Sequence, residues 1–251
     1  MVVMPARNAA LTLVRTVRAV PADWVDEIIL VDDKSTDDTV AVALALRGEQ
    51  AETGDAPDLH VISHPHNVGY GGNQKTCYME ALKREADVVV MLHPDGQYEP
   101  DLIPHLVEPI LGGRADLVLG SRMLEPGQAR QGGMPMHKRL ANRGLTAVEN
   151  RILGTSFSEL HTGYRAYSRD LLMGVPFLRN ANDFSFDSEI IMQSVHFGHR
   201  IVEVPARSRY FDDASSIKLG PATVYAIKTL WAGVRLMLHR RGVLRSRRFQ
   251  P

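Results

Sequence analysis

The amino-acid sequence predicts an α/β fold in which a mostly parallel sheet is flanked by helices. Short apolar runs alternate along the chain with longer segments whose apolar residues recur at helical spacing. Several of the apolar runs end directly in clusters of polar residues. Because the carboxyl ends of parallel strands lie at one edge of a sheet, we expect these clusters to meet in a ligand-binding crevice.

The composition supports a folded domain and limits the classes of function. The chain has 251 residues, of which 44% are hydrophobic and 23% are charged, as in ordinary globular proteins. Lys plus Arg and Asp plus Glu both number 29, so no net charge attracts the protein to nucleic acid. The single cysteine, Cys77, and the absence of a secretion signal predict a cytoplasmic protein. No apolar run reaches the roughly 18 residues that a membrane-spanning helix needs.

The first half of the chain is expected to supply the strand and helix alternation of such a sheet. Apolar runs predict buried strands at residues 2–4, 27–31, 59–63 and 87–92. Helices are expected at residues 9–20, at 36–47 with Asp37 and Asp38 in the first turn, and from the glycine-rich loop 67–73 to residue 84.

The second half continues this pattern and ends in a basic segment. Strands are expected at 116–120 and 200–204, a basic helix at 135–153, and a mobile loop at 125–133 that acts as a lid. Residues 225–238 predict an amphipathic helix, because Lys228 and Arg235 interrupt its apolar residues. We therefore divide the chain into a main domain, residues 1–219, and an amphipathic helix with a basic tail, residues 220–251.

The sequence HPDGQ, directly after the strand 87–92, is the candidate metal site. His93, Asp95 and Gln97 alternate along it and offer one imidazole nitrogen and two oxygens. Such a mixed set suits Mn²⁺ or Mg²⁺ held together with phosphate oxygens. The alternative is a simple turn around Pro94 and Asp95 that caps the strand. A second polar cluster, Asp32 and Asp33, ends the strand 27–31 and is expected to bind a base or ribose, or to precede a helix cap at Ser35 or Thr36.

Seven segments in order resemble the family 2 glycosyltransferases. The resemblance is strongest to the branch that contains dolichyl-phosphate mannose synthase and the polyprenyl-phosphate glycosyltransferases, and it implies the Rossmann-like GT-A fold. The matching segments are VVMPARNAALTL, EIILVDDKSTDDT, NVGYGGNQ, VVVMLHPDGQYEPD, DLVLGSRM, ELHTGYRAYSR and FSFDSEI. Together they extend over most of the chain.

This resemblance implies a nucleotide-sugar donor and a metal cofactor, Mn²⁺ or Mg²⁺. Arg7 and Ala9 stand where many relatives have an aromatic residue and a glutamate, so the base is left open between guanine, as in GDP-mannose, and uracil. His93 replaces the first aspartate of the family motif Asp-x-Asp-x-Gln, whereas Asp95 and Gln97 match it. The implied donor-binding residues are Pro5, Ala6, Arg7, Ala9, Val31, Asp33, His93, Pro94, Asp95, Arg122 and Arg209.

The chemistry of transfer explains why charged groups are needed. Cleavage of the bond between the anomeric carbon and a diphosphate leaves negative charge on the phosphate, which a divalent cation and an arginine such as Arg122 stabilise. The resemblance implies that Arg122 lies close to the phosphates, so Asp95 and Arg122 are candidate catalytic residues, and Glu189, which also matches the family, is the third. The alternative for Arg122 is a surface arginine at a strand end. If the acceptor is a sugar hydroxyl, Asp187 or Glu189 is the candidate general base.

The acceptor side is predicted from the basic helix 135–153 and from the residues after the last strand. The resemblance implies that Lys138 and Asn142, with Arg139 beside them, receive an acceptor phosphate, and the alternative is a solvated basic surface. A phosphate acceptor is already an anionic nucleophile and needs no general base. The resemblance also implies that Arg209 contacts the diphosphate from a loop that includes Arg207, Tyr210, Ser215, Ser216 and Lys218.

Two further expectations concern single features. His161 is expected to bond a neighbouring backbone group. The C-terminal segment combines apolar residues such as Trp231 with several arginines, which suits the anionic headgroups of a membrane surface. Its alternative is an amphipathic helix that packs on the domain or on a second copy of the chain in a homo-oligomer, followed by a disordered basic tail.

Three functions are consistent with these observations. The leading hypothesis is an inverting transfer of a hexose, of mannose or glucose type, from a nucleotide-sugar to a polyprenyl phosphate at the inner face of the membrane. The second hypothesis is transfer to a sugar hydroxyl in polysaccharide or glycolipid synthesis. The third is a protein that binds nucleotide-sugars without turnover, because His93 alters the usual metal motif.

Overall fold

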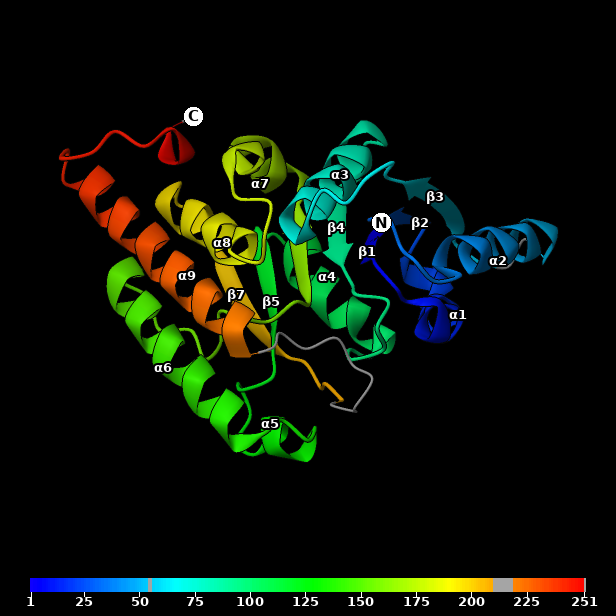
Figure 1. Ribbon diagram of the computed structural model, residues 1–251, viewed down its shortest axis with the longest axis horizontal. Coiled ribbons are helices and arrows are strands. Elements are labelled where there is room, and N and C mark those ends of the chain that lie inside the picture. Colours follow the sequence, from blue (N-terminus) through cyan, green and yellow to red (C-terminus); the bar gives the residue numbers. More distant parts are fainter. Residues whose placement is uncertain (54–55, 210–218, 251) are drawn as a thin grey trace.

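A mixed seven-stranded sheet forms the centre of the computed structural model, which describes residues 1–53, 56–209 and 219–250 (Figure 1). Its strands lie in the order β3-β2-β1-β4-β6-β5-β7, and only β6 runs antiparallel to its neighbours, β4 and β5. The strands are β1 (Val2–Ala6), β2 (Glu27–Asp32), β3 (Asp58–Ser63), β4 (Val88–Met91), β5 (Leu117–Ser121), β6 (Arg165–Ser168) and β7 (Ile201–Pro205).

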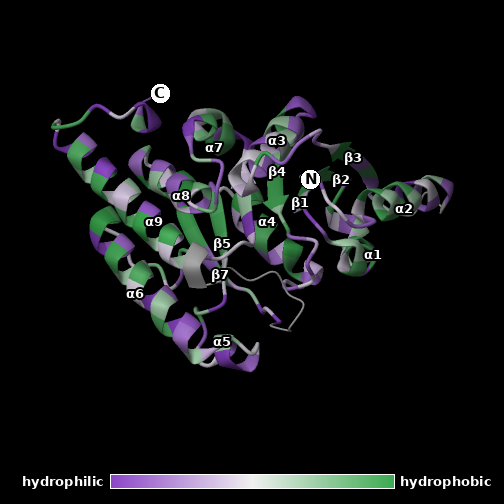
Figure 2. Ribbon diagram, in the orientation of Figure 1, coloured by the Kyte–Doolittle hydropathy of each residue, from purple (hydrophilic) through white to green (hydrophobic). Residues whose placement is uncertain are grey.

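Alternate residues of the strands build two hydrophobic cores, one on each face of the sheet. Ile29 and Val31 of β2 belong to one core, whereas Ile28 and Leu30 belong to the other. Buried residues of α1 (Ala10–Arg18), α2 (Thr39–Thr53) and α4 (Ile103–Leu111) join the second core. The first core contains residues of α3 (Tyr70–Lys83), α6 (Met136–Leu153), α7 (Arg169–Gly174), α8 (Phe186–His196) and α9 (Leu219–Arg240). Figure 2 shows that the central strands are predominantly hydrophobic along their length.

The predicted α/β architecture is confirmed, and the structure adds a strand that the sequence did not indicate. All six predicted strands form, each within a few residues of its expected bounds. The additional strand is β6, which is only four residues long and begins with the charged Arg165. This arginine is fully buried although it is charged. β6 therefore has no apolar run of the kind by which a buried strand is recognised in a sequence.

Three local predictions need correction. The helix expected from residue 36 begins at Thr39, because the Asp37 carboxylate accepts hydrogen bonds from the Thr39 amide at 3.1 Å and from its hydroxyl at 2.5 Å. The glycine-rich stretch 67–73 is only partly a loop, since α3 already begins at Tyr70. The expected lid at 125–133 contains a short helix, α5 (Gln128–Gln131).

The predicted disordered basic tail is wrong for the described residues up to 250. Helix α9 lies alongside α6, and the chain then returns toward α8 (Figure 1). Phe249 is 3% exposed and belongs to the first core, and the backbone carbonyl of Arg248 accepts a hydrogen bond from Gln193 at 2.8 Å. Hydrophobic burial and backbone hydrogen bonds therefore order this segment. Among the described residues, no helix has the length and apolar character needed to cross a membrane.

Gly71 sets how closely α3 approaches the segment before α8. Its amide donates to the Asn182 carbonyl at 2.8 Å. A Cβ at this position would lie 2.5 Å from the Ala181 carbonyl oxygen and 2.6 Å from Cβ of Phe186. Only a glycine allows this contact, because the opposing atoms belong to backbone and to a buried side chain.

We predict that Gly71→Ala lowers the free energy of unfolding by about 1–3 kcal/mol, as expected for overpacking. Gly48→Ala is the matched control, because Gly48 lies within α2 and nothing comes within 4 Å of its added Cβ. The control should keep or raise stability, by up to about 1 kcal/mol. Urea unfolding followed by circular dichroism measures both, and equal stability of the two variants would contradict the close approach.

Candidate active site

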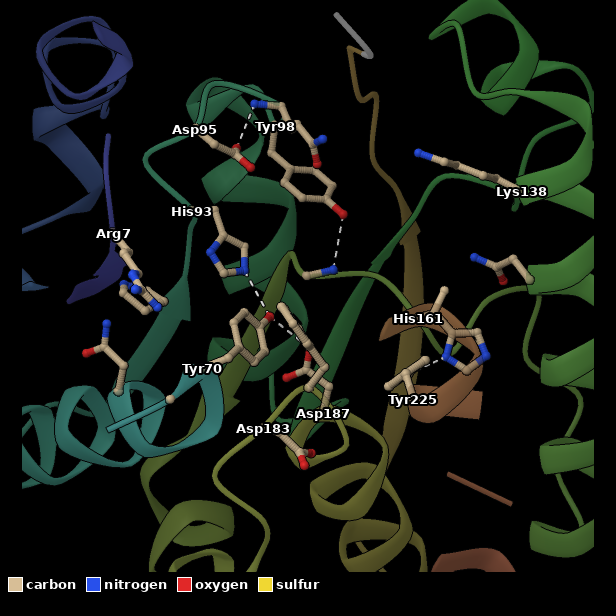
Figure 3. Close-up of a pocket in the computed structure, with 18 of the residues that line it drawn as sticks. Arg7, Tyr70, His93, Asp95, Tyr98, Lys138, His161, Asp183, Asp187 and Tyr225 are labelled. Atoms are coloured by element: carbon tan, nitrogen blue, oxygen red, sulfur yellow. Dashed lines mark hydrogen bonds between the residues drawn. The ribbon is translucent and has the colours of Figure 1, made fainter. Parts of the chain in front are cut away.

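A cavity of about 790 Å³ lies at the carboxyl ends of the parallel strands (Figure 3). Loops after β1, β2, β4 and β5 form one side of it, and α6, α9 and the segment before α8 form the other. This volume is typical of a site for a nucleotide-sized ligand. The predicted site residues that line it are Pro5, Ala6, Arg7, Asp33, His93, Asp95, Gln97, Arg122, Lys138 and Asn142.

Hydrogen bonds between the loops after β1 and β2 shape the end of the cavity at which Arg7 lies. The Asn8 amide donates to Oγ of Ser35 at 2.8 Å, and the Thr36 amide donates to Oδ1 of Asn8 at 2.8 Å. Asn8 adopts a left-handed φ of 52°, so the loop turns sharply directly after Arg7. The exposed Arg7 side chain is thereby presented at the cavity.

Two of the implied donor-binding residues, Val31 and Ala9, are not brought to the cavity. Val31 is fully buried in the first core, where its side chain packs among other apolar groups. Ala9 precedes α1, and its amide donates to the Thr39 hydroxyl at 2.8 Å. Both residues support the loops of the site from behind and do not line it.

Asp33 lines the cavity, but its carboxylate is also committed to the backbone. It accepts hydrogen bonds from the amides of Val68 at 2.7 Å and Gly69 at 3.1 Å, and Nδ1 of His64 lies 3.4 Å away. Asp33 is 3% exposed. In the structure Asp33 therefore fixes the turn that leads into α3. Its contact with a base or ribose stays a prediction.

The segment HPDGQ presents its three candidate metal ligands to the same cavity. Oδ1 of Asp95 accepts the Gln97 amide at 2.9 Å, so the predicted turn forms, and metal binding by these side chains stays a prediction. Pro94 does not line the cavity, and its carbonyl accepts the Thr12 hydroxyl at 2.6 Å. A carboxylate, an amide oxygen and an imidazole fit Mn²⁺ or Mg²⁺. A cation held by one carboxylate also keeps positive charge for a diphosphate.

A chain of polar groups reaches His93 from the fully buried Arg165. Nη1 of Arg165 lies 3.0 Å from Oδ1 of Asp187, which also accepts Nε2 of Gln74 at 2.9 Å. Oδ2 of Asp187 accepts the Tyr70 hydroxyl at 2.9 Å, and the same hydroxyl lies 3.1 Å from Nε2 of His93 (Figure 3). Burial, with the Asp187 carboxylate beside it, raises the pKa of Tyr70 well above its usual range, so the phenol stays neutral.

The two carboxylates proposed as general bases are engaged elsewhere. Asp187 lines the cavity, but it is the partner of Arg165, which has no exposed surface. Glu189 does not line the cavity. It is 3% exposed, accepts the Ala181 amide at 2.7 Å and forms an ion pair with Arg248. The structure therefore gives Glu189 a supporting position beneath the site, because burial and ion pairing remove it from solvent and substrate.

Arg122 reaches the cavity from the end of β5 and is held by a buried carboxylate. Its Nε donates to Glu159 at 2.9 Å, and its Nη2 donates to the His161 carbonyl at 3.0 Å. Burial by itself raises the pKa of Glu159, but the Arg122 guanidinium and its hydrogen bonds hold that pKa below the usual range. Nδ2 of Asn142 donates to the same carboxylate at 2.7 Å. Glu159 therefore links the predicted phosphate contact to the predicted acceptor helix.

The acceptor end of the cavity is formed by α6 and α9. Lys138 and Asn142 of α6 line it, whereas Arg139 does not. The expectation for His161 is wrong, because its ring contacts side chains of two helices. Its Nδ1 lies 2.7 Å from the Tyr225 hydroxyl of α9, and its Nε2 lies 2.9 Å from Oε2 of Glu149 of α6. This contact joins the two helices at the cavity wall.

Arg209 lies outside the cavity in this structure. Its guanidinium is exposed and pairs with Glu99 at 2.9 Å, while its amide donates to the Gln97 carbonyl at 2.8 Å. The predicted contact with the diphosphate therefore stays a prediction. Arg207 of the same predicted loop is exposed and also lies outside the cavity. The other residues of that loop, Tyr210, Ser215, Ser216 and Lys218, lie outside the described residues.

Several residues of the site were not identified from the sequence. Tyr70, Glu159 and Arg165 each lie within a segment that carries the family resemblance, and that position was their only signal. Tyr225 lies in the amphipathic segment 225–238 and had no signal of its own. Their partners lie 17 to 117 residues away along the chain, so no local pattern relates them.

The family and the relatives that this chain resembles are glycosyltransferases. The model of the family Glycosyl transferase family 2 matches residues 1–175. The chain is 30% identical over 198 residues to undecaprenyl-phosphate mannosyltransferase of Micrococcus luteus, covering 78% of this chain and 75% of that protein. It is 27% identical over 214 residues to UDP-N-acetylglucosamine--dolichyl-phosphate N-acetylglucosaminyltransferase of Methanococcus voltae, covering 83% of this chain and 84% of that protein.

A solved structure shows the same fold. Glucosyl-3-phosphoglycerate synthase from Mycobacterium tuberculosis, crystallised with Mn²⁺, UDP and glucosyl-3-phosphoglycerate, superposes with a TM-score of 0.67 at 23% identity. The match covers 98% of this chain and 80% of that one. The fold is thus the GT-A fold that the sequence predicted. With a family model matched over residues 1–175 and a 30%-identical relative, this chain belongs to glycosyl transferase family 2.

Proposed function

We propose that this glycosyltransferase moves a hexose from a nucleotide-sugar to a polyprenyl phosphate, with inversion and with the help of a divalent cation. The observation that carries the proposal is that one cavity holds the candidate metal ligand Asp95 together with Arg122 and Lys138. A single cavity thus offers a ligand for a cation, a positive group for the departing diphosphate and a second positive group for an anionic acceptor.

The donor half of the proposal rests on Asp95, His93 and Gln97. The described residues contain no group of three or more His, Cys, Asp or Glu side chains that could hold a metal by themselves. In the proposal the protein therefore shares the cation, Mn²⁺ or Mg²⁺, with the diphosphate. When bound, the cation acts as a Lewis acid on the leaving phosphate. Arg122, held in place by Glu159, adds a fixed positive charge on the same side of the cavity.

The acceptor half is favoured by the state of the nearby carboxylates. A sugar hydroxyl needs a general base. Of the candidates, Asp187 is paired with Arg165 and Glu189 lies outside the cavity. Asp183 also lines the cavity, and it is paired with Lys228. A phosphate oxygen is already nucleophilic and is attracted by Lys138. Relatives named for undecaprenyl-phosphate and dolichyl-phosphate acceptors support the same substrate class. Beyond Lys138, the cavity wall is apolar and suits isoprene units; it is formed by Met134, Ala141, Leu145, Ala222 and Ala226.

The surface of α6 and α9 supports a peripheral contact with the membrane that contains such an acceptor. Leu140 on α6, and Ile227 and Trp231 on α9, are large apolar side chains with more than half of their surface exposed. Exposed arginines of α6, among them Arg143 and Arg151, lie on the same helix as Leu140. Apolar side chains that insert among lipids, flanked by cations for the headgroups, are typical of such a contact.

We predict that Asp95→Asn removes the metal-dependent part of nucleotide binding. The amide keeps the size of the side chain and an acceptor for the Gln97 amide, so the turn is retained. Calorimetry with GDP and with UDP should show Mn²⁺-dependent affinity that falls at least about 10-fold, with metal-free affinity unchanged. Asp101→Asn, outside the cavity, is the control. Unaltered Mn²⁺-dependent affinity in Asp95→Asn would overturn the assignment of the metal site.

Lys138→Met should raise KM for polyprenyl phosphate by roughly 10-fold, because it removes one charge from the acceptor site but keeps the apolar stem. Slow hydrolysis of the donor in the absence of acceptor should be unaffected. Initial rates of lipid-linked sugar formation measure the effect. Lys83→Met removes an exposed charge of α3, away from the cavity and from the proposed membrane contact, and serves as control. Equal KM values for the two variants, or no lipid-linked product from the wild type, would reject the acceptor assignment.

Ile227→Ser combined with Trp231→Ser should weaken sedimentation with anionic vesicles by several-fold. Both side chains are exposed on α9, so the fold is retained, whereas truncation would remove the buried Phe249. Leu111→Ser on α4 is the control, since Leu111 is also exposed but lies on another helix. Identical sedimentation of the double variant and the wild type would rule out this surface as the membrane contact.

A further inference from the structure

In the hydrogen-bonded chain from Arg165 to His93, each contact has a defined donor and a defined acceptor, because the number of protons on each group is limited. Four elements supply it: β6 holds Arg165, α8 holds Asp187, α3 holds Tyr70, and His93 follows β4. Each link is between 2.9 and 3.1 Å long. Tyr70 and Asp187 also border the cavity, but His93 is the member of the chain that lies in the segment HPDGQ with the other candidate metal ligands, Asp95 and Gln97.

The ionised state of Asp187 is the starting point. Arg165 has no exposed surface, so its guanidinium needs a counter-ion, and Asp187 lies 3.0 Å from it. Nε2 of Gln74 donates to the same carboxylate at 2.9 Å. A carboxylate with these two donors has no proton of its own to give, and it acts only as an acceptor.

The proton of Tyr70 must therefore point to Asp187. A phenol has one proton, and the 2.9 Å contact between its oxygen and the carboxylate uses it. The Tyr70 oxygen can then only accept at its second contact, 3.1 Å from Nε2 of His93. In a neutral imidazole that donates from Nε2, the lone pair lies on Nδ1.

We infer that Tyr70, oriented by Asp187 and Arg165, is a positioning residue that holds His93 as the Nε2–H tautomer and so makes Nδ1 a ligand for the divalent cation. This inference rests on the cation of the proposed function. In Figure 3 the second ring nitrogen points away from Tyr70, toward the side of the cavity where Arg7 lies. The orientation of the ring is also restricted by Gly163, where an added Cβ would lie 3.0 Å from Cδ2 of His93.

This arrangement also explains how a histidine can stand where a carboxylate would be expected in a cation site. A neutral imidazole brings no charge to the cation. Hydrogen bonding of its N–H to a group that is itself bonded to a carboxylate raises the basicity of the ligating nitrogen. The Tyr70 and Asp187 pair thus transmits part of the carboxylate's effect to the cation, while the charge of Asp187 stays paired with buried Arg165.

The first test reads the tautomer without any metal. Two-bond ¹H–¹⁵N correlation spectra of the metal-free protein distinguish Nε2–H from Nδ1–H in a neutral histidine. His93→Gln identifies the signal among the 10 histidines. We expect the Nε2–H pattern in the wild type and its loss, or a mixture of tautomers, in Tyr70→Phe. An Nδ1–H pattern in the wild type, or an unchanged pattern in Tyr70→Phe, would overturn the inference.

The second test measures the cation. Tyr70→Phe keeps the ring that packs 4.5 Å from Phe184 but removes the hydroxyl. Mn²⁺ affinity in the presence of UDP or GDP should fall by roughly 10-fold, and the ¹⁴N coupling of bound Mn²⁺ in pulsed electron paramagnetic resonance should weaken. Tyr164→Phe is the control, because it removes a tyrosine hydroxyl that donates to the Glu99 carbonyl and lies outside the cavity.

The outcomes separate this inference from the proposed function. If the wild type binds no Mn²⁺ with either nucleotide, the proposed function fails, whereas the tautomer is still read in the metal-free spectra. If Asp95→Asn loses Mn²⁺-dependent binding but Tyr70→Phe keeps wild-type affinity and ¹⁴N coupling, the site is correct and the role of Tyr70 is rejected.

Discussion

The buried ion pair between Arg165 and Asp187 is the interaction on which the architecture of the site depends. It connects the antiparallel strand β6, in the middle of the sheet, to α8, which carries the segment that closes the cavity. An arginine without exposed surface is tolerated only with a partner, and removal of one member of such a pair typically costs about 3–5 kcal/mol. The pair therefore keeps α8 at the sheet. Because Asp187 also binds Tyr70, it positions the beginning of α3 as well.

Other buried carboxylates perform the same task at other edges of the cavity. Asp33 accepts two backbone amides before α3, and Glu159 holds Arg122 at the end of β5. Glu203 of β7 in turn accepts the amides of Ser158 and Glu159. These carboxylates fix the loops around the cavity, whose wall carries both positive and negative side chains.

The helices α6 and α9 give the cavity its second side, and they connect chemistry to location. The contact of His161 with Tyr225 and Glu149 joins both helices to the segment before β6. On their inner side they present Lys138 and apolar residues to the cavity, and on their outer side they expose large apolar side chains. An acceptor with an anionic head and an apolar tail matches both sides of this layer. The same pair of helices thus links the proposed acceptor site with the proposed membrane contact.

The sequence by itself determined every described strand except β6, the helices α1, α2, α3, α6 and α9, and the candidate metal segment. Apolar runs and the spacing of His93, Asp95 and Gln97 involve residues that are close together in the sequence. A turn that directly follows a strand places such residues at the edge of the sheet, whatever the rest of the fold. The tertiary structure alone decided which charged residues face the cavity and which form buried ion pairs with each other. Glu189 is paired with Arg248, 59 residues away, and β6 forms around a buried arginine whose partner lies on α8. Which charged residues pair over long sequence distances depends on how the helices pack on the sheet, so it cannot be predicted from their spacing in the sequence.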